Sequence, residues 1–475
     1  MSLEVSSRDF EQLAHDAMGD TTLQQALGRL QFGLSAMRGA ALARMPEFER
    51  LRDEGRAIRD HTLAHLDAYL ERFADAVEAS GGQVHFATDA ADARRIILEL
   101  CQQVGARKVT KGKSMVTEEI ELNAHLQANG IETLETDLGE YILQLRDEKP
   151  SHIVGPAIHL LKEQVAETFA EHHADAPAFD DETRREAAGL MAEARTVIRR
   201  HFLEADVGIT GANFAIAETG STVIVTNEGN GDLTQSLPKV HIAVTGIEKV
   251  VPTLEDAATL IRLLTRSATG QEASVYTTFS TGPKRAEDPD GPEAFHVVLV
   301  DNGRSGMLGG DFQEMLRCIR CGACMNHCPV YGQVGGHAYG SVYPGPMGAV
   351  LTPSLAGIDE AGHLPNASTF CGACEAVCPV RIPLPGLMRR WRRREFEQQA
   401  RPSVARLSLA FWSFVARRPR LYRLGARLFA RSLALLGDDD ARLRRLPLGG
   451  SWTAWRDMPA PQGESFVHAW QRRRH

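Results

Sequence analysis

Seven of the eight cysteines lie between residues 318 and 378, and their spacing carries the strongest chemical signal in the sequence. The first run, CIRCGACMNHCP, has four cysteines in the order C-x2-C-x2-C-x3-C-P: Cys318, Cys321, Cys324 and Cys328. In bacterial ferredoxins this spacing lets three thiolates bind one [4Fe–4S] cluster while the fourth binds another. The second run, FCGACEAVCP, repeats the last three positions: Cys371, Cys374 and Cys378. The pattern therefore predicts two iron–sulfur clusters.

In the ferredoxin pattern, the last cysteine of each run binds the cluster of the other run, and this predicts the ligands of each cluster. The first cluster would have four thiolates: Cys318, Cys321, Cys324 and Cys378. The second would have three: Cys328, Cys371 and Cys374. Its fourth corner falls at Ser368, which stands where a complete repeat would have a cysteine. Three alternatives stay open at this corner: the Ser368 oxygen as a ligand, a water molecule, or a missing iron as in [3Fe–4S].

The cysteines point to metal binding in a reducing compartment. Paired C-x2-C units also build zinc ribbons, but a zinc site has no use for the two C-x3-C-P endings, so iron–sulfur clusters are favoured. No stretch approaches the roughly 18 consecutive apolar residues of a membrane span. The first residues, MSLEVSSRDF, lack the basic and apolar regions of a secretory signal. We therefore expect a cytoplasmic protein whose cysteines bind metal rather than form disulfides.

A length of 475 residues predicts several domains, and four segments differ in pattern. Residues 1–80 space their apolar residues as helices do, and residues 81–303 alternate short β-rich runs with helical stretches. Residues 304–388 hold the cysteines, and residues 389–475 are rich in Arg and Trp. These patterns predict an N-terminal helical segment, an α/β domain, a helical ferredoxin-like domain and a helical C-terminal tail.

Four short runs open the α/β segment as expected strands: QVHFATD, RKVTKGK, IETLETD and SHIVGPA. Helical stretches such as DARRIILELCQQVG lie between them, which is the order of a parallel sheet with crossover helices. A longer segment, residues 329–370, separates the two cysteine runs. Its glycines and aromatics suit either a folded excursion against a neighbouring surface or a plain surface loop.

The α/β segment offers two candidate sites of its own. The loop after KVT contains Lys111, Lys113 and Ser114 before an expected helix, so it could hold an anion. It is not a phosphate-binding P-loop, because that motif would need glycine at Arg107. Glu218, in AETGSTVIV, is a candidate nucleophile, although the sequence offers no base or oxyanion partner for it. Its alternative is a polar pocket or turn.

Histidines in the sequence have no ligand pattern. Four of them lie on or beside apolar runs and are expected to be hydrogen-bonded core residues: His152, His159, His241 and His296. Two more, His327 and His337, lie in the cysteine segment, where nothing in the spacing makes them ligands.

The tail from Arg389 onward differs in charge from the rest of the chain. It has 20 Arg, no Lys and seven acidic residues, a balance of +13 against −21 for residues 1–388, and it holds all five tryptophans. Its helical pattern, broken at Pro419, suits docking on an acidic partner or on the chain's own acidic body, and also suits an anionic membrane surface. Docking is favoured. The tail has no module that reads nucleic-acid grooves, so no nucleic-acid partner is predicted.

Several long strings together resemble the lactate-utilisation protein B family. They are KGKSMVTEEIELN, ETDLGEYILQL, PSHIVGPAIH, DGPEAFHVVLVDNGRS, CIRCGACMNHCPVY, GGHAYGSVYPGPMGAVLTP and FCGACEAVCPVRIPLP. The resemblance implies a cytoplasmic protein with two cubane-type clusters that carries electrons in the oxidation of L-lactate to pyruvate, with two partner subunits (LutA- and LutC-like). It also implies that the α/β part is a Rossmann-like LUD domain, similar to sugar isomerases and CoA transferases. A serine at position 368 is common in this family.

The pattern and the resemblance together predict an electron-transfer function. The chain would pass electrons from a 2-hydroxy acid, oxidised with partner subunits, to a respiratory acceptor such as a quinone or cytochrome. The absence of a dinucleotide-binding G-x-G-x-x-G after a strand favours a carrier over a complete dehydrogenase. The alternative is that the LUD domain is itself an isomerase or acyl-transfer enzyme, with clusters that are structural or redox-sensing.

Overall fold

The computed structural model describes residues 6–173, 179–398, 403–446, 449–454 and 456–473. The chain forms two compact units, one up to residue 395 and one from residue 396 onward. The first unit combines the N-terminal helices, the α/β segment and the cysteine segment. The boundaries expected from the sequence at residues 80 and 303 stay predictions, because both lie inside the first compact unit.

A six-stranded parallel sheet forms the centre of the α/β segment, with strand order β1-β10-β7-β4-β2-β3. The strands are β1 Gln83–Ala87, β10 Ala294–Val300, β7 Val240–Gly246, β4 Val207–Thr210, β2 Lys108–Gly112 and β3 Glu132–Glu135. The central strand β7 is buried along its whole length, as expected for a parallel strand covered on both faces. The predicted α/β class with a parallel sheet is thus confirmed.

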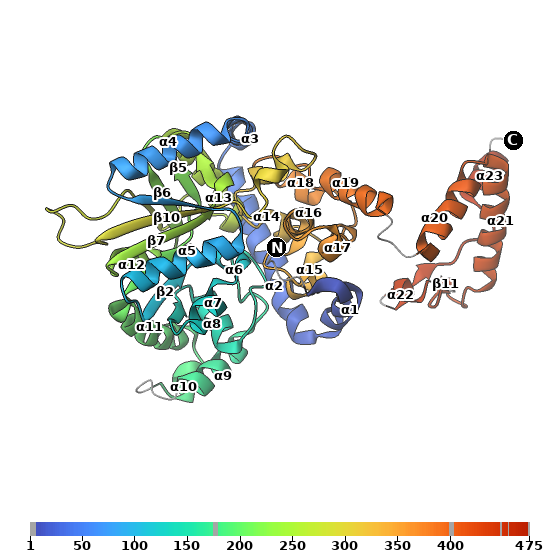
Figure 1. Cartoon of the computed structure of the whole chain (residues 1–475). Helices are drawn as coiled ribbons and strands as arrows, with labels where there is room; N and C mark the ends of the chain where they lie inside the picture. Colours follow the sequence, from blue (N-terminus) through green and yellow to red (C-terminus); the bar gives the residue numbers. More distant parts are fainter. Residues whose placement is uncertain (1–5, 174–178, 399–402, 447–448, 455, 474–475) are drawn as a thin grey trace. The chain divides into compact units, whose positions relative to one another are not determined.

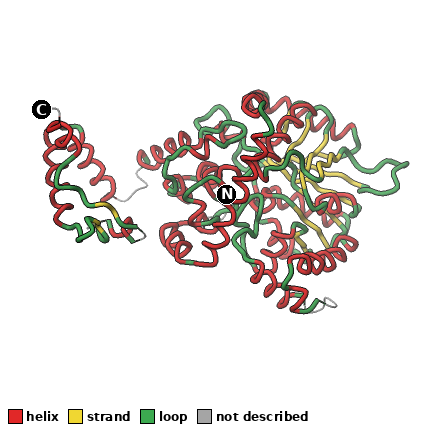
Figure 2. Tube along the Cα trace, turned by 180° about the vertical axis from the view of Figure 1, so that it is seen from behind, coloured by secondary structure: helices red, strands yellow, loops and turns green. Residues whose placement is uncertain are grey.

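Helices cover both faces of this sheet (Figures 1 and 2). Strand β10 divides its side chains between two cores, because successive residues of a strand point to opposite faces. Val298 and Val300 pack in a core that contains residues of α5 Ala90–Gln103, α6 Met115–Glu119 and α7 Leu122–Ala128. Val297 and Leu299 pack in a core with residues of α4 Leu66–Ala79.

A third core lies beside the edge strand β3 and is built by helices that follow it in sequence. The core contains Tyr141 and Phe169 together with residues of the long helix α11. The helices of this region are α8 Leu138–Arg146, α9 Lys162–His172, α10 Asp181–Arg184 and α11 Ala187–Glu204, while α12 Asn230–Ser236 packs against β4 and β2.

A second, four-stranded sheet has the order β8-β5-β6-β9 and was not distinguished in the sequence pattern. Its strands are β5 Phe214–Ile216, β6 Ser221–Thr226, β8 Val250–Val251 and β9 Tyr276–Ser280. The antiparallel β5–β6 hairpin turns at Gly220, whose φ is +67°. A Cβ there would lie 2.5 Å from the Val77 nitrogen, so the turn requires glycine. Helix α13 Leu254–Thr269 follows β8 and starts at Thr253, which caps it.

The predicted N-terminal helices are present. They are α1 Phe10–Gly19, α2 Thr21–Ala43, α3 Phe48–Ala64 and α4, preceded by a 3-10 turn, η1 Ser7–Asp9. Asp20 caps α2, because its carboxylate accepts hydrogen bonds from the Thr22 and Leu23 amides at 2.9 and 3.0 Å.

The expected strand SHIVGPA is wrong: residues 151–157 form turns. The Ser151 N–H donates to the Pro156 carbonyl at 3.0 Å, which folds the segment back on itself. His152 Nδ1 accepts from the Val154 and Gly155 amides, both at 3.1 Å. These local bonds take the amides that a strand would need for a sheet, and the apolar side chains Ile153 and Val154 pack against the core that contains the cysteines.

The cysteine segment is built from short helices around one core. The elements are η3 Ser305–Met307, η4 Gln313–Arg317, α14 Ala323–Asn326, α15 Tyr331–Val334, η5 His337–Tyr339, α16 Gly345–Ala356, α17 Ile358–Ala361, η6 Leu364–Asn366, α18 Ala373–Ala376 and α19 Leu384–Glu397. Helix α16 is buried at nearly every residue. Residues 329–370 are therefore a folded excursion, and the plain surface loop is ruled out.

The second unit is a small helical domain. Its elements are α20 Ser403–Ala416, α21 Pro419–Leu435, α22 Gly450–Thr453, α23 Phe466–Arg473 and the strand pair β11 Arg442–Leu443 and β12 Met458–Pro459. Pro419 begins α21, where proline is tolerated because the first helical N–H needs no partner. Phe411, Trp412 and Phe429 are 71, 63 and 63% exposed, whereas Trp455 lies outside the described residues. Among the described residues, no helix is both long and apolar enough to cross a membrane.

Candidate iron–sulfur centre

The central C-x2-C turns of the two cysteine runs share a pattern of left-handed backbone conformations, which matches their sequence repeat. In the first run, Arg320 and Gly322 flank Cys321 with φ of +59° and +74°. At the same places in the second run, Phe370 and Gly372 have φ of +55° and +84°. Each glycine is followed by a four-residue helix, α14 or α18. A left-handed conformation is uncommon for residues other than glycine, and both Arg320 and Phe370 adopt it. The shared geometry therefore indicates a duplicated cysteine loop.

Four cysteines come together at one apolar cavity. They are the four expected for the first cluster: Cys318, Cys321, Cys324 and Cys378. The cavity is also lined by Ile319, Met347 and Ile382, which are buried. The Ile382 N–H donates to the Cys378 sulfur at 3.3 Å. Such bonds to sulfur are among the features that tune iron–sulfur clusters.

Near neutral pH, the buried thiols of Cys321 and Cys378 stay protonated when no cluster is bound. Burial raises the pKa of Cys321 to about 12 and that of Cys378 to about 11, and the neighbouring sulfurs add to the shift. Four sulfurs in apolar surroundings are the ligand set that a [4Fe–4S] cluster takes. Because the cysteines come from both runs, the geometry agrees with the expected exchange of Cys378.

The other three cysteines form a second group. Burial raises the pKa of Cys374 to about 12, and the nearby Cys328 raises it further. Cys328 in turn has its pKa raised by burial and by Cys371. The Tyr331 N–H approaches the Cys328 sulfur at 3.5 Å. These three side chains are thus electrostatic neighbours of one another, as the exchange pattern requires for a second cluster.

Ser368 keeps a local partner. Its hydroxyl oxygen accepts a hydrogen bond from the Phe370 N–H at 3.1 Å, which shapes the turn before Cys371. That bond leaves the hydroxyl with further acceptor capacity. The bond is compatible with each of the three alternatives at this corner: a Ser368 ligand, a water molecule or a missing iron.

Buried basic side chains hold the backbone of both cysteine loops, and the sequence analysis did not predict them. Arg52 donates to the Cys378 carbonyl at 2.8 and 3.0 Å, and Arg59 donates to the Leu316 carbonyl at 3.0 Å. Lys249 donates to the Cys318 carbonyl at 2.9 Å. Arg52 and Arg59 lie two turns apart on α3, and this spacing of two arginines on a face that is otherwise buried could have revealed them.

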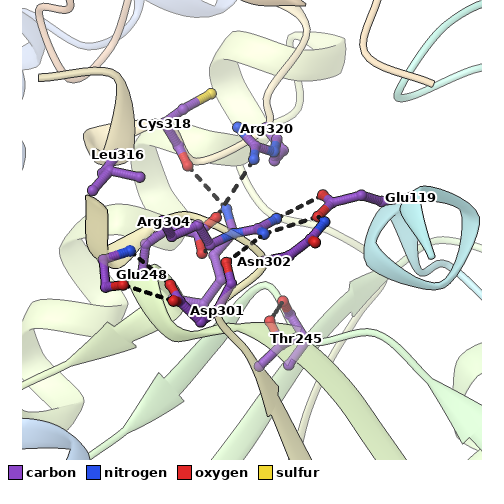
Figure 3. Close-up of polar contacts among 12 residues, drawn as sticks. Glu119, Thr245, Glu248, Asp301, Asn302, Arg304, Leu316, Cys318 and Arg320 are labelled. Carbon is purple, nitrogen blue, oxygen red and sulfur yellow. Dashed lines mark hydrogen bonds and ion pairs between the residues drawn. The ribbon is translucent and has the colours of Figure 1, made fainter. Parts of the chain in front are cut away.

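A network of buried ion pairs connects the α/β segment to the first cysteine loop (Figure 3). Arg304 makes a two-point contact with Glu119 at 2.7 and 2.9 Å and an ion pair with Glu248 at 2.8 Å. Glu248 also pairs with Arg320 at 3.4 Å. Burial opposes ionisation of Glu248, but Arg304, Lys249 and Arg320 outweigh it and lower the pKa of Glu248 to about 2. The carboxylate therefore stays charged and fixes the cations beside Cys318.

The three residues of the expected anion site are engaged within the protein. The Lys111 ammonium is buried and pairs with Glu118 and, at 2.7 Å, with Glu135. Lys113 pairs with Asp137 at 2.7 Å and with Glu228 at 3.1 Å. Ser114 caps α6 by accepting from the Thr117 N–H at 3.2 Å. Since carboxylates of the chain already neutralise both lysines, this geometry does not support the anion-site prediction.

Glu218 has a structural contact that accounts for it. The side chain is exposed in the turn between β5 and β6. Its carboxylate accepts from the Leu254 N–H at 3.1 Å, at the start of α13. Carboxylates are favourable there because the first amides of a helix need acceptors. The candidate nucleophile thus gains no catalytic partner from the structure.

Replacement of Arg304 tests the buried network. Arg304→Gln would leave Glu119 and Glu248 buried without their main counter-ion, so we expect a loss of about 3–5 kcal/mol in the free energy of unfolding. The measurement is anaerobic urea denaturation followed by circular dichroism. As a matched control, Arg44→Gln removes an exposed pair with Glu272 and should leave the midpoint unchanged. Equal midpoints for the two variants would contradict the role of the network.

The thiol order in cluster-free protein gives a second test. Hydrogen bonds from the Ala373 N–H and the Thr369 hydroxyl lower the pKa of Cys371, whereas burial raises that of Cys374 and Cys101 to about 12. The thiolate is the nucleophile, so near neutral pH iodoacetamide should modify Cys371 before Cys374 and Cys101. Peptide mass spectrometry after timed quenching reports the order. Modification of Cys374 before Cys371 would show that the loop is arranged differently.

Three family models match the chain from residue 70 onward. A LUD domain matches residues 70–300, a 4Fe-4S dicluster domain matches residues 314–382, and the C-terminal domain of lactate utilisation protein B matches residues 393–475. The dicluster match covers both cysteine loops described above. These matches assign the parallel sheet to a LUD domain and support iron–sulfur clusters at the cysteines.

Curated relatives align along nearly the whole chain. Lactate utilization protein B of Shouchella clausii is 46% identical over 468 residues, which cover 98% of this chain and 97% of the relative. The protein of the same name from Bacillus pumilus is 44% identical over 468 residues, 98% of each chain. The Escherichia coli protein named "Uncharacterized electron transport protein YkgF" is 43% identical over 466 residues, 98% of this chain and 97% of that protein. The chain belongs to the lactate utilisation protein B family.

Proposed function

We propose that the chain carries electrons, one at a time, away from the oxidation of L-lactate to pyruvate. The observation that carries the proposal is the exchange geometry of the cysteines: Cys378 joins the first group, while Cys328 joins the second. Support also comes from the names of the relatives, which include lactate utilisation and electron transport. The proposal includes two clusters of the [4Fe–4S] type. At the Ser368 corner of the second cluster it keeps the three alternatives given above.

Each part of the cysteine segment has a role in such a carrier. Iron–sulfur clusters supply one-electron redox chemistry when they are bound. Cys324 and Cys328 belong to different groups but lie one helical turn apart, at α14 and just after it, so the backbone holds the two sites close together. Apolar walls exclude water from the first site. Arg52 and Arg320 bring positive charge that balances the negative charge of thiolate ligands, whereas burial and the neighbouring Arg320 lower the pKa of Lys249 to about 7.

Lactate oxidation itself is assigned to a complex with partner subunits, LutA- and LutC-like, and the electrons would pass to a quinone or cytochrome. These partners are the ones that the family resemblance implies. The proposal is supported by the α/β segment, where Lys111, Lys113 and Glu218 are each engaged in internal contacts. The complex would work in the cytoplasm. The Arg-rich second unit, with its exposed aromatic residues Phe411 and Trp412, would dock on an acidic surface of a partner or of the chain itself, or contact the inner face of the membrane.

Iron and sulfide analysis with EPR spectroscopy of anaerobically purified protein tests the carrier proposal. We expect about eight irons and eight acid-labile sulfides per chain, with a spin-coupled spectrum after dithionite reduction. Cys321→Ala should lose about half of the iron, since it removes a ligand of the first cluster only. Cys101→Ala, a buried cysteine in α5, is the matched control and should keep all of it.

The other outcomes have defined meanings. About seven irons and a [3Fe–4S] signal in the oxidised protein would leave the carrier proposal in place and show that the corner at Ser368 is empty. Zinc without sulfide would overturn the proposal. Equal iron contents for Cys321→Ala and Cys101→Ala would contradict the assignment of Cys321.

A further inference from the structure

A cluster of two histidines and one glutamate lies where a loop of the LUD domain meets the excursion of the cysteine segment. Glu148 and His159 flank the turn at residues 151–157, and His337 begins η5. His159 Nε2 lies 2.9 Å from Glu148 Oε2, and the two imidazole rings are 4.4 Å apart between centroids. One ligand atom from each of the three residues lies within 4.8 Å of the other two. None of the three belongs to the cysteine sites.

Each of the three side chains is oriented by a separate partner. Arg146 donates to Glu148 Oε1 at 2.8 Å, which leaves Oε2 facing His159. Ser151 Oγ contacts His159 Nδ1 at 2.7 Å, which leaves Nε2 facing Glu148. The Lys149 carbonyl contacts His337 Nε2 at 2.8 Å, which leaves Nδ1 available. Ligands of metal sites are typically held in this way, with the second ring nitrogen of each histidine bonded to an oxygen.

The hydroxyl of Ser151 completes the arrangement. It lies 2.9 Å from the Pro156 carbonyl, to which it can donate its single proton. It then accepts from His159 Nδ1–H, so that the Nε2 lone pair points at the Glu148 carboxylate. Two acceptors 2.9 Å apart repel each other unless a cation lies between them. Without a cation, the other tautomer satisfies the pair, with His159 Nε2–H donating to Glu148.

The cluster opens onto a cavity of about 410 Å³ that is lined by polar residues, among them Thr22, Gln164 and Ser341. His337 is exposed, so a cation can enter from solvent. Two imidazoles and one carboxylate with room for further ligands is the donor set of catalytic zinc sites and of non-haem iron(II) sites. Two ligands about 2.1 Å from a tetrahedral zinc ion lie about 3.4 Å apart, so His159 Nε2 and Glu148 Oε2, now 2.9 Å apart, would separate by about 0.5 Å on binding.

We propose that Glu148, His159 and His337 form a binding site for one divalent transition-metal ion, separate from the iron–sulfur clusters. The metal would fasten the LUD domain to the excursion between the cysteine runs, because Glu148 and His159 come from the first and His337 from the second. Tyr331 already joins the same two parts, since its hydroxyl donates to the Ser151 carbonyl at 2.6 Å.

Zinc binding to the cluster-loaded, full-length protein under anaerobic conditions tests the site. Zn²⁺ is the probe because it binds nitrogen and oxygen ligands more tightly than Fe²⁺ or Mn²⁺. We expect about one zinc per chain after equilibrium dialysis, measured by mass spectrometry of the metals, with the iron content unchanged. His337→Ala and Glu148→Gln should each lose this zinc, and Ser151→Ala should weaken binding by about 10- to 100-fold.

His172→Ala is the matched control. His172 is an exposed histidine of the same domain that bonds to the Thr168 carbonyl, and its replacement should leave zinc binding intact. Three results would each overturn the proposal: no zinc on the wild-type protein, equal binding by His337→Ala and wild type, or zinc uptake matched by loss of iron. Because His337 is exposed, its variant should fold, and its iron content and circular dichroism verify that it has. Zinc binding and iron content are separate readouts, so either proposal can fail alone.

Discussion

Positive charge buried around the cysteine loops is the constraint on which the rest of the first unit depends. Thiolate ligands bring negative charge into an apolar cavity, and charge in such surroundings is costly unless it is balanced. Arg52 and Arg59 bring positive charge close to the loops, where hydrogen bonds to the Cys378 and Leu316 carbonyls hold them. These cations need fixed counter-ions of their own. Arg52 pairs with Glu49 at 2.9 Å, and the buried carboxylate of Glu248 is the nearby negative charge that favours the charged forms of Arg59 and Lys249.

This constraint explains why the α/β segment and the cysteine segment share one compact unit. Glu119 ends α6 and Glu248 follows the central strand β7, and both pair with Arg304, which lies after β10. Glu248 also pairs with Arg320 of the first cysteine loop. A single apolar core also combines residues of the N-terminal helices, the second sheet and the cysteine loops. The LUD domain is thus, at the least, the scaffold that keeps the charges around the cysteines in place. The ion pairs of Lys111 and Lys113 with carboxylates of the chain itself agree with a scaffold role.

The sequence predicted what depends on local spacing and missed what depends on long-range packing. The cysteine groups followed from C-x2-C and C-x3-C-P spacing, and the parallel sheet followed from the alternation of strands and helices. The strand expected at 151–157 failed because its amides bond locally to Pro156 and His152. The partners of Arg59 and Arg304 could not be predicted from the sequence. They lie about 190 positions away in the chain and come from several segments at once. His159 was expected to be a core residue, and its contact with Glu148 and His337 depends on a turn that the sequence pattern did not reveal.

Reduction of the chain by L-lactate in the presence of its partner subunits tests the central claim most directly. Anaerobic protein would be mixed with the partners and lactate, frozen at successive times and examined by EPR. The account predicts that the reduced-cluster signal grows within one turnover and decays when an acceptor is added, and that Cys321→Ala slows the flow of electrons to the acceptor. Lactate-dependent reduction of the acceptor at an unchanged rate, with no change in the cluster signal or with Cys321→Ala in place, would contradict it.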